Sequence, residues 1–372
     1  MTAAKVRIPV CAPDLGAGEE EAVRQAVRSG FISSKGPFVG RFEEGFARYI
    51  GVGHGVAVSS GTAALHLAMV ALGIGPGDEV IVPDLTMIAV ANSVTYTGAR
   101  PVPVDAERET WNLDPDLVEA AVTPRTRAII AVHTYGHPVR MDRLMEVARD
   151  RRLRVVEDAA EAIGSEYRGV RVGGLGDLGC FSFYANKVIT TGEGGMVVAN
   201  DASLAARVRS LADQGFGARE RFRHEVVGFN YRLTNLQAAL GFAQLERVEE
   251  LVEARRRNAS RYEGQLADIA DLVRPPQAAW AKNVYWMYSV LLRAERRSEI
   301  ARRLLEEFGI ETRPFFVPIS EQPVYHGLPP GGPTPIAAEL SRRGLNLPSG
   351  SGLRAEEIQY VAAALETTLS GG

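Results

Sequence analysis

Residues 55–73, GVAVSSGTAALHLAMVALG, contain the pattern that decides the fold. A short apolar run is followed by the polar turn SSGT and then by apolar residues at helical spacing. The same order recurs in segments that begin at residues 79, 100, 126 and 153. Strands that are apolar throughout are typical of a sheet covered on both faces, and alternation with helices predicts crossovers between parallel strands. We therefore predict a three-layer α/β/α domain with a mostly parallel sheet.

Beyond about residue 200 the alternation stops, which indicates a change of architecture. An apolar stripe predicts one long helix from Asn235 to about Asn258, leading toward the pair Pro275 and Pro276. Strands are then predicted at 284–292, 310–314 and 344–348, and helices at 298–309 and 355–365. We predict a large α/β domain at residues 1–250 and a smaller α+β domain at residues 251–372.

Composition excludes several classes of protein. The 372 residues include 42 Lys and Arg and 45 Asp and Glu, a net charge of −3, which argues against nucleic-acid and membrane-surface binding. No apolar run reaches the roughly 18 residues of a membrane span, and the first ten residues lack the apolar core of a signal peptide. The 2 cysteines are too few for a disulfide framework or a cysteine zinc cluster. We expect a cytoplasmic protein.

The turn after the first strand is a candidate phosphate site. Gly61 and Thr62 stand where a helix is predicted to begin, and a helix start offers unpaired N–H groups and partial positive charge. Gly61 would let an anion approach the backbone, and Thr62 could donate its hydroxyl. An ordinary helix cap explains the same residues.

Asp158 ends the apolar run LRVVED, and parallel sheets bind ligands at the carboxyl ends of their strands. A carboxylate there could hold a cationic ring nitrogen or a metal. An ATPase is excluded because the chain has no G-x-x-x-x-G-K-[ST] motif. A cap on the following helix is the alternative.

Lys187 lies in CFSFYANKVITTGEGG, whose aromatic, small and β-branched residues predict an interior segment. Burying an ammonium is costly, but desolvation lowers the pKa of an amine and frees it for Schiff-base chemistry. Ser182, five residues earlier, could reach the same phosphate as Gly61 and Thr62. A lysine that extends its amine to solvent is the alternative.

Two further motifs are interpreted as structural. Residues 174–179 spell G-x-G-x-x-G, but a strand-like run follows where a dinucleotide fingerprint requires a helix. His133 and His137 are separated by Gly136, and no further histidine or cysteine set supports zinc, so we predict no metal site.

The phosphate cradle, the strand-end Asp158 and the buried Lys187 together form the set of groups that pyridoxal 5'-phosphate requires. One group anchors the phosphate, a carboxylate keeps the ring nitrogen protonated, and a lysine bonds to the aldehyde. Because each signal alone has a structural alternative, the prediction depends on their combination.

Nearly the whole chain resembles the DegT-like family of fold-type I, pyridoxal-phosphate-dependent nucleotide-sugar aminotransferases. The resemblance is carried by residues 31–51, 59–83, 156–164, 181–195, 228–250 and 344–348. It implies a nucleotide-linked keto-sugar as substrate, L-glutamate as amino donor, and a homodimer with shared active sites. The reaction implied is amination at C4 of a 4-keto-6-deoxyhexose. Amination at C3 or of another keto-sugar, and a non-catalytic sensor of the cofactor or the nucleotide sugar, remain alternatives.

The resemblance also implies roles for individual residues. Lys187 and Asp158 would be catalytic, with Asp158 paired to the pyridine nitrogen. Glu161 would lie near the ring hydroxyl, and Met87 would cover the ring where the family has an aromatic side chain. The phosphate would be held by Gly61, Thr62 and Ser182, and by Asn230 of the neighbouring subunit.

Overall fold

The computed structural model describes residues 6–216, 222–328 and 331–370. Residues 1–5 and 371–372, the outer ends of the two predicted domains, lie outside the described residues. In the described part of the chain, no helix combines the length and the apolar character that a membrane span needs.

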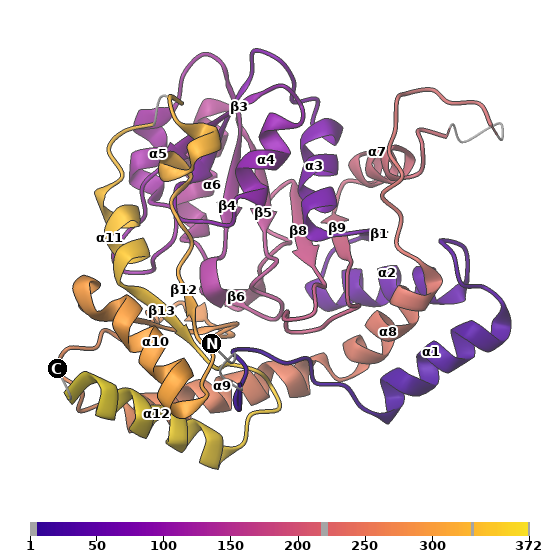
Figure 1. The fold of residues 1–372 in the computed structure, drawn as a ribbon. Helices are drawn as coiled ribbons and strands as arrows, with labels where there is room; N and C mark the ends of the chain where they lie inside the picture. Colours follow the sequence, from indigo (N-terminus) through magenta and orange to yellow (C-terminus); the bar gives the residue numbers. More distant parts are fainter. Residues whose placement is uncertain (1–5, 217–221, 329–330, 371–372) are drawn as a thin grey trace.

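A seven-stranded sheet forms the centre of the described structure (Figure 1). Its strands are, in spatial order, β1 (His54–Val58), β9 (Gly195–Ala199), β8 (Leu178–Ser182), β5 (Arg154–Asp158), β4 (Thr126–Val132), β2 (Glu79–Pro83) and β3 (Arg100–Val104). The strands from β8 to β3 are parallel, and β9 is antiparallel to both of its neighbours. The prediction of a mostly parallel sheet is confirmed.

Helices cover both faces of this sheet, as the apolar strands predict. In β4, Ile129 and Ala131 face the same core as Phe42, whereas Ala128 and Ile130 face a second core with Leu67. The first face is covered by α2 (Pro37–Ile50), α5 (Pro115–Ala121), α6 (Met141–Arg151) and α8 (Asn235–Glu246), and the second by α3 (Gly61–Ala71), α4 (Ala89–Thr95) and α7 (Ala202–Ala212). The three-layer architecture is thereby confirmed.

The prediction of one long helix from Asn235 to about Asn258 is wrong, because this segment is divided between two helices. Arg247, with φ −118° and ψ 19°, separates α8 from α9 (Val248–Gln265). The guanidinium of Arg247 lies 2.9 Å from Asp14 and 3.3 Å from Glu19, which is in α1 (Ala17–Ser29). A periodic apolar stripe continues across such a break, so the pattern alone does not show it.

The C-terminal region has its own antiparallel sheet, in the order β11 (Tyr288–Leu291), β13 (Gly344–Leu347) and β12 (Arg313–Pro314). Around it lie α10 (Arg297–Phe308), α11 (Pro335–Arg343) and α12 (Ala355–Ser370). Elsewhere a small sheet joins β10 (Ala281–Lys282), β6 (Glu166–Tyr167) and β7 (Val170–Arg171). Helix α9 contributes Leu251 to the large core and Tyr262 to the C-terminal core. The domain boundary at residue 250 therefore remains a prediction.

The G-x-G-x-x-G turn surrounds a carboxylate of the protein itself. Backbone N–H groups of Gly173, Leu175 and Gly176 donate to the buried Glu157 at 2.6–2.8 Å. His133 Nε2 lies 3.1 Å from the same carboxylate, and His133 Nδ1 accepts from the backbone of Val139. The second bond fixes the imidazole as an Nε2 donor. The N–H groups of this turn are thus paired with a carboxyl group of the protein's own sheet.

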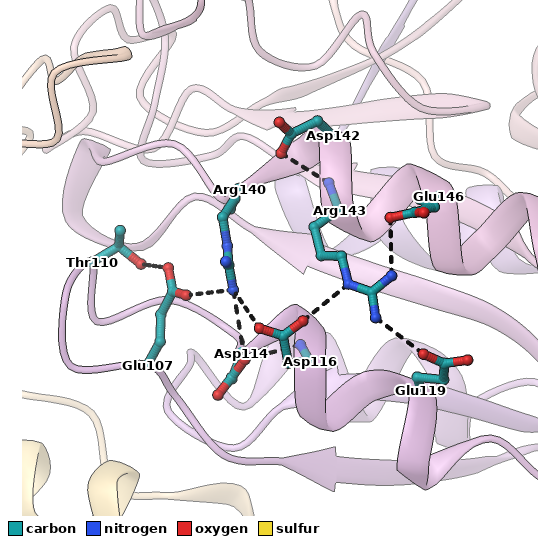
Figure 2. Close-up of polar contacts among 9 residues, drawn as sticks. All are labelled: Glu107, Thr110, Asp114, Asp116, Glu119, Arg140, Asp142, Arg143 and Glu146. Carbon is teal, nitrogen blue, oxygen red and sulfur yellow. Dashed lines mark hydrogen bonds and ion pairs between the residues drawn. The ribbon is translucent and has the colours of Figure 1, made fainter.

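A surface network joins α5 to α6 (Figure 2). Arg143 contacts Asp116, Glu119 and Glu146 at 2.9–3.0 Å, and Arg140 lies 3.2 Å from Glu107. Most of these groups are partly exposed, so the pairs are screened by water and contribute little to stability. The buried layers, rather than this network, hold the two helices on the sheet.

Replacing Glu157 tests how much the turn at residues 173–176 depends on its carboxylate. We expect Glu157→Gln to lower the free energy of unfolding by about 2–4 kcal/mol, because the new amide would face donors of Gly173 and His133. Denaturant titration measures this loss. Glu249→Gln, which removes an exposed partner of Arg171, is the matched control and should cost less than about 1 kcal/mol. An equal loss of unfolding free energy in the two variants would contradict the role of Glu157 in stabilising this turn.

Candidate active site

A cavity of about 400 Å³ lies at the carboxyl ends of β5 and β8. All the predicted site residues except Asn230 line it, namely Gly61, Thr62, Met87, Asp158, Glu161, Ser182 and Lys187. Other residues along the cavity wall include Thr86, Asn186, Trp286, Arg313 and Phe316. The three groups that the sequence places far apart are therefore brought to one site.

The start of α3 forms one end of the cavity. Ser60 caps the helix, since its Oγ accepts from the backbone of Ala63 at 3.1 Å. Helix α3 and strand β8 approach so closely that a Cβ on Gly61 would lie 2.8 Å from the Cβ of Ser182. Gly61 is therefore required for this packing. The helix start, Thr62 and Ser182 together offer donors and positive partial charge to an anion.

Asp158 is the last residue of β5 and is buried. Its Oδ1 accepts from the backbone of Ala160 at 3.0 Å, but burial raises the pKa of the carboxyl despite this bond. A buried carboxylate at a cavity wall is stabilised when a cation binds opposite it. The carboxylate of Asp158 is therefore suited to pair with the cationic ring nitrogen of a ligand.

Lys187 extends from the loop after β8 into the cavity, and its side chain is only 11% exposed. Its Nζ lies 3.8 Å from Glu161 Oε1 and 3.7 Å from the centroid of the Trp286 ring. Burial lowers the pKa of the amine, which favours its nucleophilic form. Burial also raises the pKa of Glu161 to about 7, although its Oε2 accepts from the backbone of Tyr135 at 2.7 Å.

Two further atoms at the cavity indicate a polar ligand. Thr86 Oγ1 and Asn186 Oδ1 are buried and have no hydrogen-bond partner in the described residues. Unpaired buried polar atoms are rare in native proteins because they lose their water partners. Together with the anion cradle and Asp158, they fit a ligand that has an anionic end and a polar, cationic ring, as pyridoxal phosphate has.

The sequence did not indicate that Trp286, or Tyr135 next to it, lies at or near the site. Trp286 comes 99 positions after Lys187 and was part of a predicted strand, where aromatic residues usually belong to the core. Tyr135, whose ring is parallel to that of Trp286 within 14°, has φ 53°. The neighbouring Gly136 was a sign of unusual backbone, but nothing local connects either ring to Lys187.

The geometry agrees with the comparison to known proteins. The sequence profile of the DegT/DnrJ/EryC1/StrS aminotransferase family matches residues 13–366. The chain belongs to this family. It is 49% identical to a GDP-perosamine synthase of Caulobacter vibrioides, over 98% of both chains. It is also 41% identical to a dTDP-3-amino-3,4,6-trideoxy-alpha-D-glucose transaminase of Streptomyces venezuelae, over 95% of this chain and 93% of the relative.

Among solved structures, the aminotransferase TlmJ from Streptoalloteichus hindustanus superposes with a TM-score of 0.93. It is 35% identical in sequence, and the match covers 98% of this chain and 99% of TlmJ. The fold-type I aminotransferase architecture expected from the sequence is thereby confirmed, and the protein is an aminotransferase.

The pKa of Glu161 predicts a pH dependence of stability. Because the folded-state pKa is raised from 4.5 to about 7, ionisation of Glu161 costs stability as pH rises through this window. We expect cofactor-free Glu161→Gln to gain stability over wild type between pH 5 and pH 8, by up to about 3 kcal/mol. At pH 4, which lies below both pKa values, the carboxyl is mostly protonated in both states and the difference should nearly vanish. A pH-independent difference in denaturant titrations would contradict this prediction.

Proposed function

We propose that the protein is a pyridoxal-phosphate-dependent aminotransferase that converts a nucleotide-linked 4-keto-6-deoxyhexose to the 4-amino sugar, with L-glutamate as amino donor. The observation that carries the proposal is the convergence of Lys187, Asp158 and the Gly61–Thr62–Ser182 cradle on one cavity. A non-catalytic sensor would have no use for a buried amine whose pKa is lowered.

The residues suggest how the cofactor would be held. Gly61, Thr62 and Ser182 would bind its phosphate, and Asp158 would hold a proton on the ring nitrogen. Met87, which is 49% exposed at the cavity, would cover the ring through its polarizable thioether. Glu161 would lie beside the ring hydroxyl. When bound, pyridoxal phosphate supplies the electron sink that amino-group transfer needs.

Two residues would then handle protons at the reacting carbon atoms. Lys187 Nζ would bond to the cofactor and, when released, would remove and return the proton in each half of the transfer. Glu161, 3.8 Å from this amine, would bear either charge state near neutral pH, since its pKa is about 7. The side chains of Lys187 and Glu161 are only 11% and 6% exposed, so both groups are largely removed from water.

The substrate assignment is supported by the Caulobacter relative, whose name specifies a GDP-linked amino sugar. Arg313 lines the cavity, and its guanidinium has no hydrogen-bond or ion-pair partner in the described residues. It could bind a carboxylate of L-glutamate or a phosphate of the nucleotide. The Streptomyces relative, whose name places its amine at C3, supports amination at C3 as the second candidate.

A panel of GDP- and dTDP-linked keto-sugars tests the proposal. With pyridoxal phosphate and glutamate, the protein should be yellow and should convert a GDP-linked 4-keto-6-deoxyhexose to a product whose amine is at C4 by NMR. Lys187→Ala should lose at least about 1,000-fold in turnover because no amine remains to move the proton. The exposed Lys35 provides the control Lys35→Ala, which should stay active. An amine at C3 would favour the second candidate, and a colourless protein would contradict the aminotransferase chemistry.

Asn230 leads to a proposal about assembly. Its side chain is exposed and accepts from Arg232 at 2.9 Å, and it does not line the cavity of its own chain. We infer that Asn230 reaches the phosphate of a neighbouring subunit's cofactor in a homodimer. The cytoplasmic location and the absence of a nucleic-acid partner remain predictions from composition.

Mixing two inactive variants tests this shared site. Asn230→Asp would place a carboxylate against the phosphate, and Lys187→Ala would inactivate the other half of the site. In exchanged hybrids one of the two sites receives both native residues, so activity should recover to about one quarter of wild type. Mixing Lys187→Ala with Asp158→Asn is the matched control, because both residues come from one chain and every site keeps a lesion. Proven exchange without recovery in the first mixture would show that Asn230 does not act across subunits.

A further inference from the structure

The indole of Trp286 lies against the amine of Lys187. The Nζ atom is 3.7 Å from the ring centroid, and Trp286 is 5% exposed, so the contact is largely desolvated. A cation over the face of an aromatic ring is attracted by the ring quadrupole, and tryptophan provides the strongest such interaction. The geometry is therefore that of a site for an ammonium ion.

The ring is held in this orientation from several sides. Its Nε1 donates to the carbonyl oxygen of Asn186 at 2.8 Å, and its face is nearly parallel to Tyr135. Arg255 Nη1 donates to the carbonyl of Trp286 at 2.8 Å, while Nη2 of the same guanidinium donates to the carbonyl of Lys187 at 3.3 Å. Trp286 is thus fixed to the peptide that carries Lys187.

The charged and titratable groups around the amine come from several segments. Burial and Arg255 oppose the ammonium form of Lys187. Glu161, Asp158 and the nearby Cys11 favour it. Glu161 can accept the proton of Lys187, whereas an indole cannot. Trp286 is therefore the neighbour that stabilises the ammonium without competing for its proton.

We propose that Trp286 is a positioning residue that holds the released ε-amine of Lys187 as an ammonium ion beside Glu161. The proposal rests on the proposed function, in which Lys187 is bonded to the cofactor in one phase of the reaction and free in the other. In the free phase the amine must stay close to the reacting carbon and keep the proton that it has removed. The ring of Trp286 serves both needs.

Acylation of Lys187 across a range of pH tests this role. The full chain would be used twice, without cofactor and with pyridoxamine 5'-phosphate, which leaves the lysine amine free. Acetic anhydride labels only neutral amines, and peptide mass spectrometry reports Lys187 separately from the exposed Lys35, which serves as the internal reference. The midpoint of the labelling curve then measures the protonation of Lys187.

Trp286→Leu should move this midpoint downward by about 0.5–1.5 pH units, because the favourable contact of the cation is lost. Trp286→Phe should move it less, since a weaker aromatic face remains. Trp280→Leu is the matched control, because that indole packs against Tyr167 and His137 instead, and its midpoint should equal that of wild type. If Trp286→Leu does not fold, the labelling midpoint of Trp286→Phe is used instead. A downward shift relative to wild type supports the proposal, and an unchanged midpoint overturns it.

A residue that only shields Lys187 from solvent would give a different labelling curve from one that stabilises its ammonium form. If Trp286 only shields Lys187, its variants would raise the labelling rate at every pH and leave the midpoint unchanged, and this outcome would overturn the proposal. The measurement on cofactor-free protein does not require an active enzyme. Failure of the wild-type protein to bind pyridoxal phosphate would instead overturn the proposed function, so the two failures are distinguishable.

Discussion

Burial of the Lys187 amine is the constraint on which the rest of the site depends. Moving an ammonium out of water is costly, so a lysine with an 11% exposed side chain requires either compensating groups or loss of its proton. Glu161 and the face of Trp286 compensate in part. Desolvation still lowers the pKa of the amine. This balance suits the amine to act as a nucleophile that also carries a proton, as the proposed amino-group transfer requires.

The parallel sheet explains how distant residues meet around this amine. Strands β5 and β8 are neighbours, and Asp158 pairs in register with Cys180, two residues before Ser182. The carboxyl ends of both strands therefore face the start of α3, where the absence of a Cβ on Gly61 allows close packing. The C-terminal region completes the cavity with Trp286 and Arg313. Residues from both predicted domains thus contribute to one site.

The sequence predicted the parts of the site that obey local rules. Asp158 and Gly61, which line the cavity, could be predicted because parallel strands and helix starts have recognisable patterns and known ligand preferences. Lys187, which also lines the cavity, could be predicted because a lysine among apolar residues is unusual. Trp286 was missed, since an aromatic residue in an apolar strand has no local mark of function. The break at Arg247 was also missed, since its contacts with Asp14 and Glu19 join residues 233 and 228 positions apart in the sequence. Asn230 could be predicted only from the family resemblance, because its expected partner belongs to another subunit.

The central claim is that Lys187 is the amine that bonds to the cofactor. Sodium borohydride, added in the presence of pyridoxal phosphate, links the cofactor irreversibly to the amine that holds it. The chain has only 4 lysines, so peptide mass spectrometry can assign the linked residue without ambiguity. We predict stoichiometric modification of the peptide that contains Lys187 and none of the peptides that contain the other lysines. A modification at another lysine, or an unmodified protein, would contradict the account.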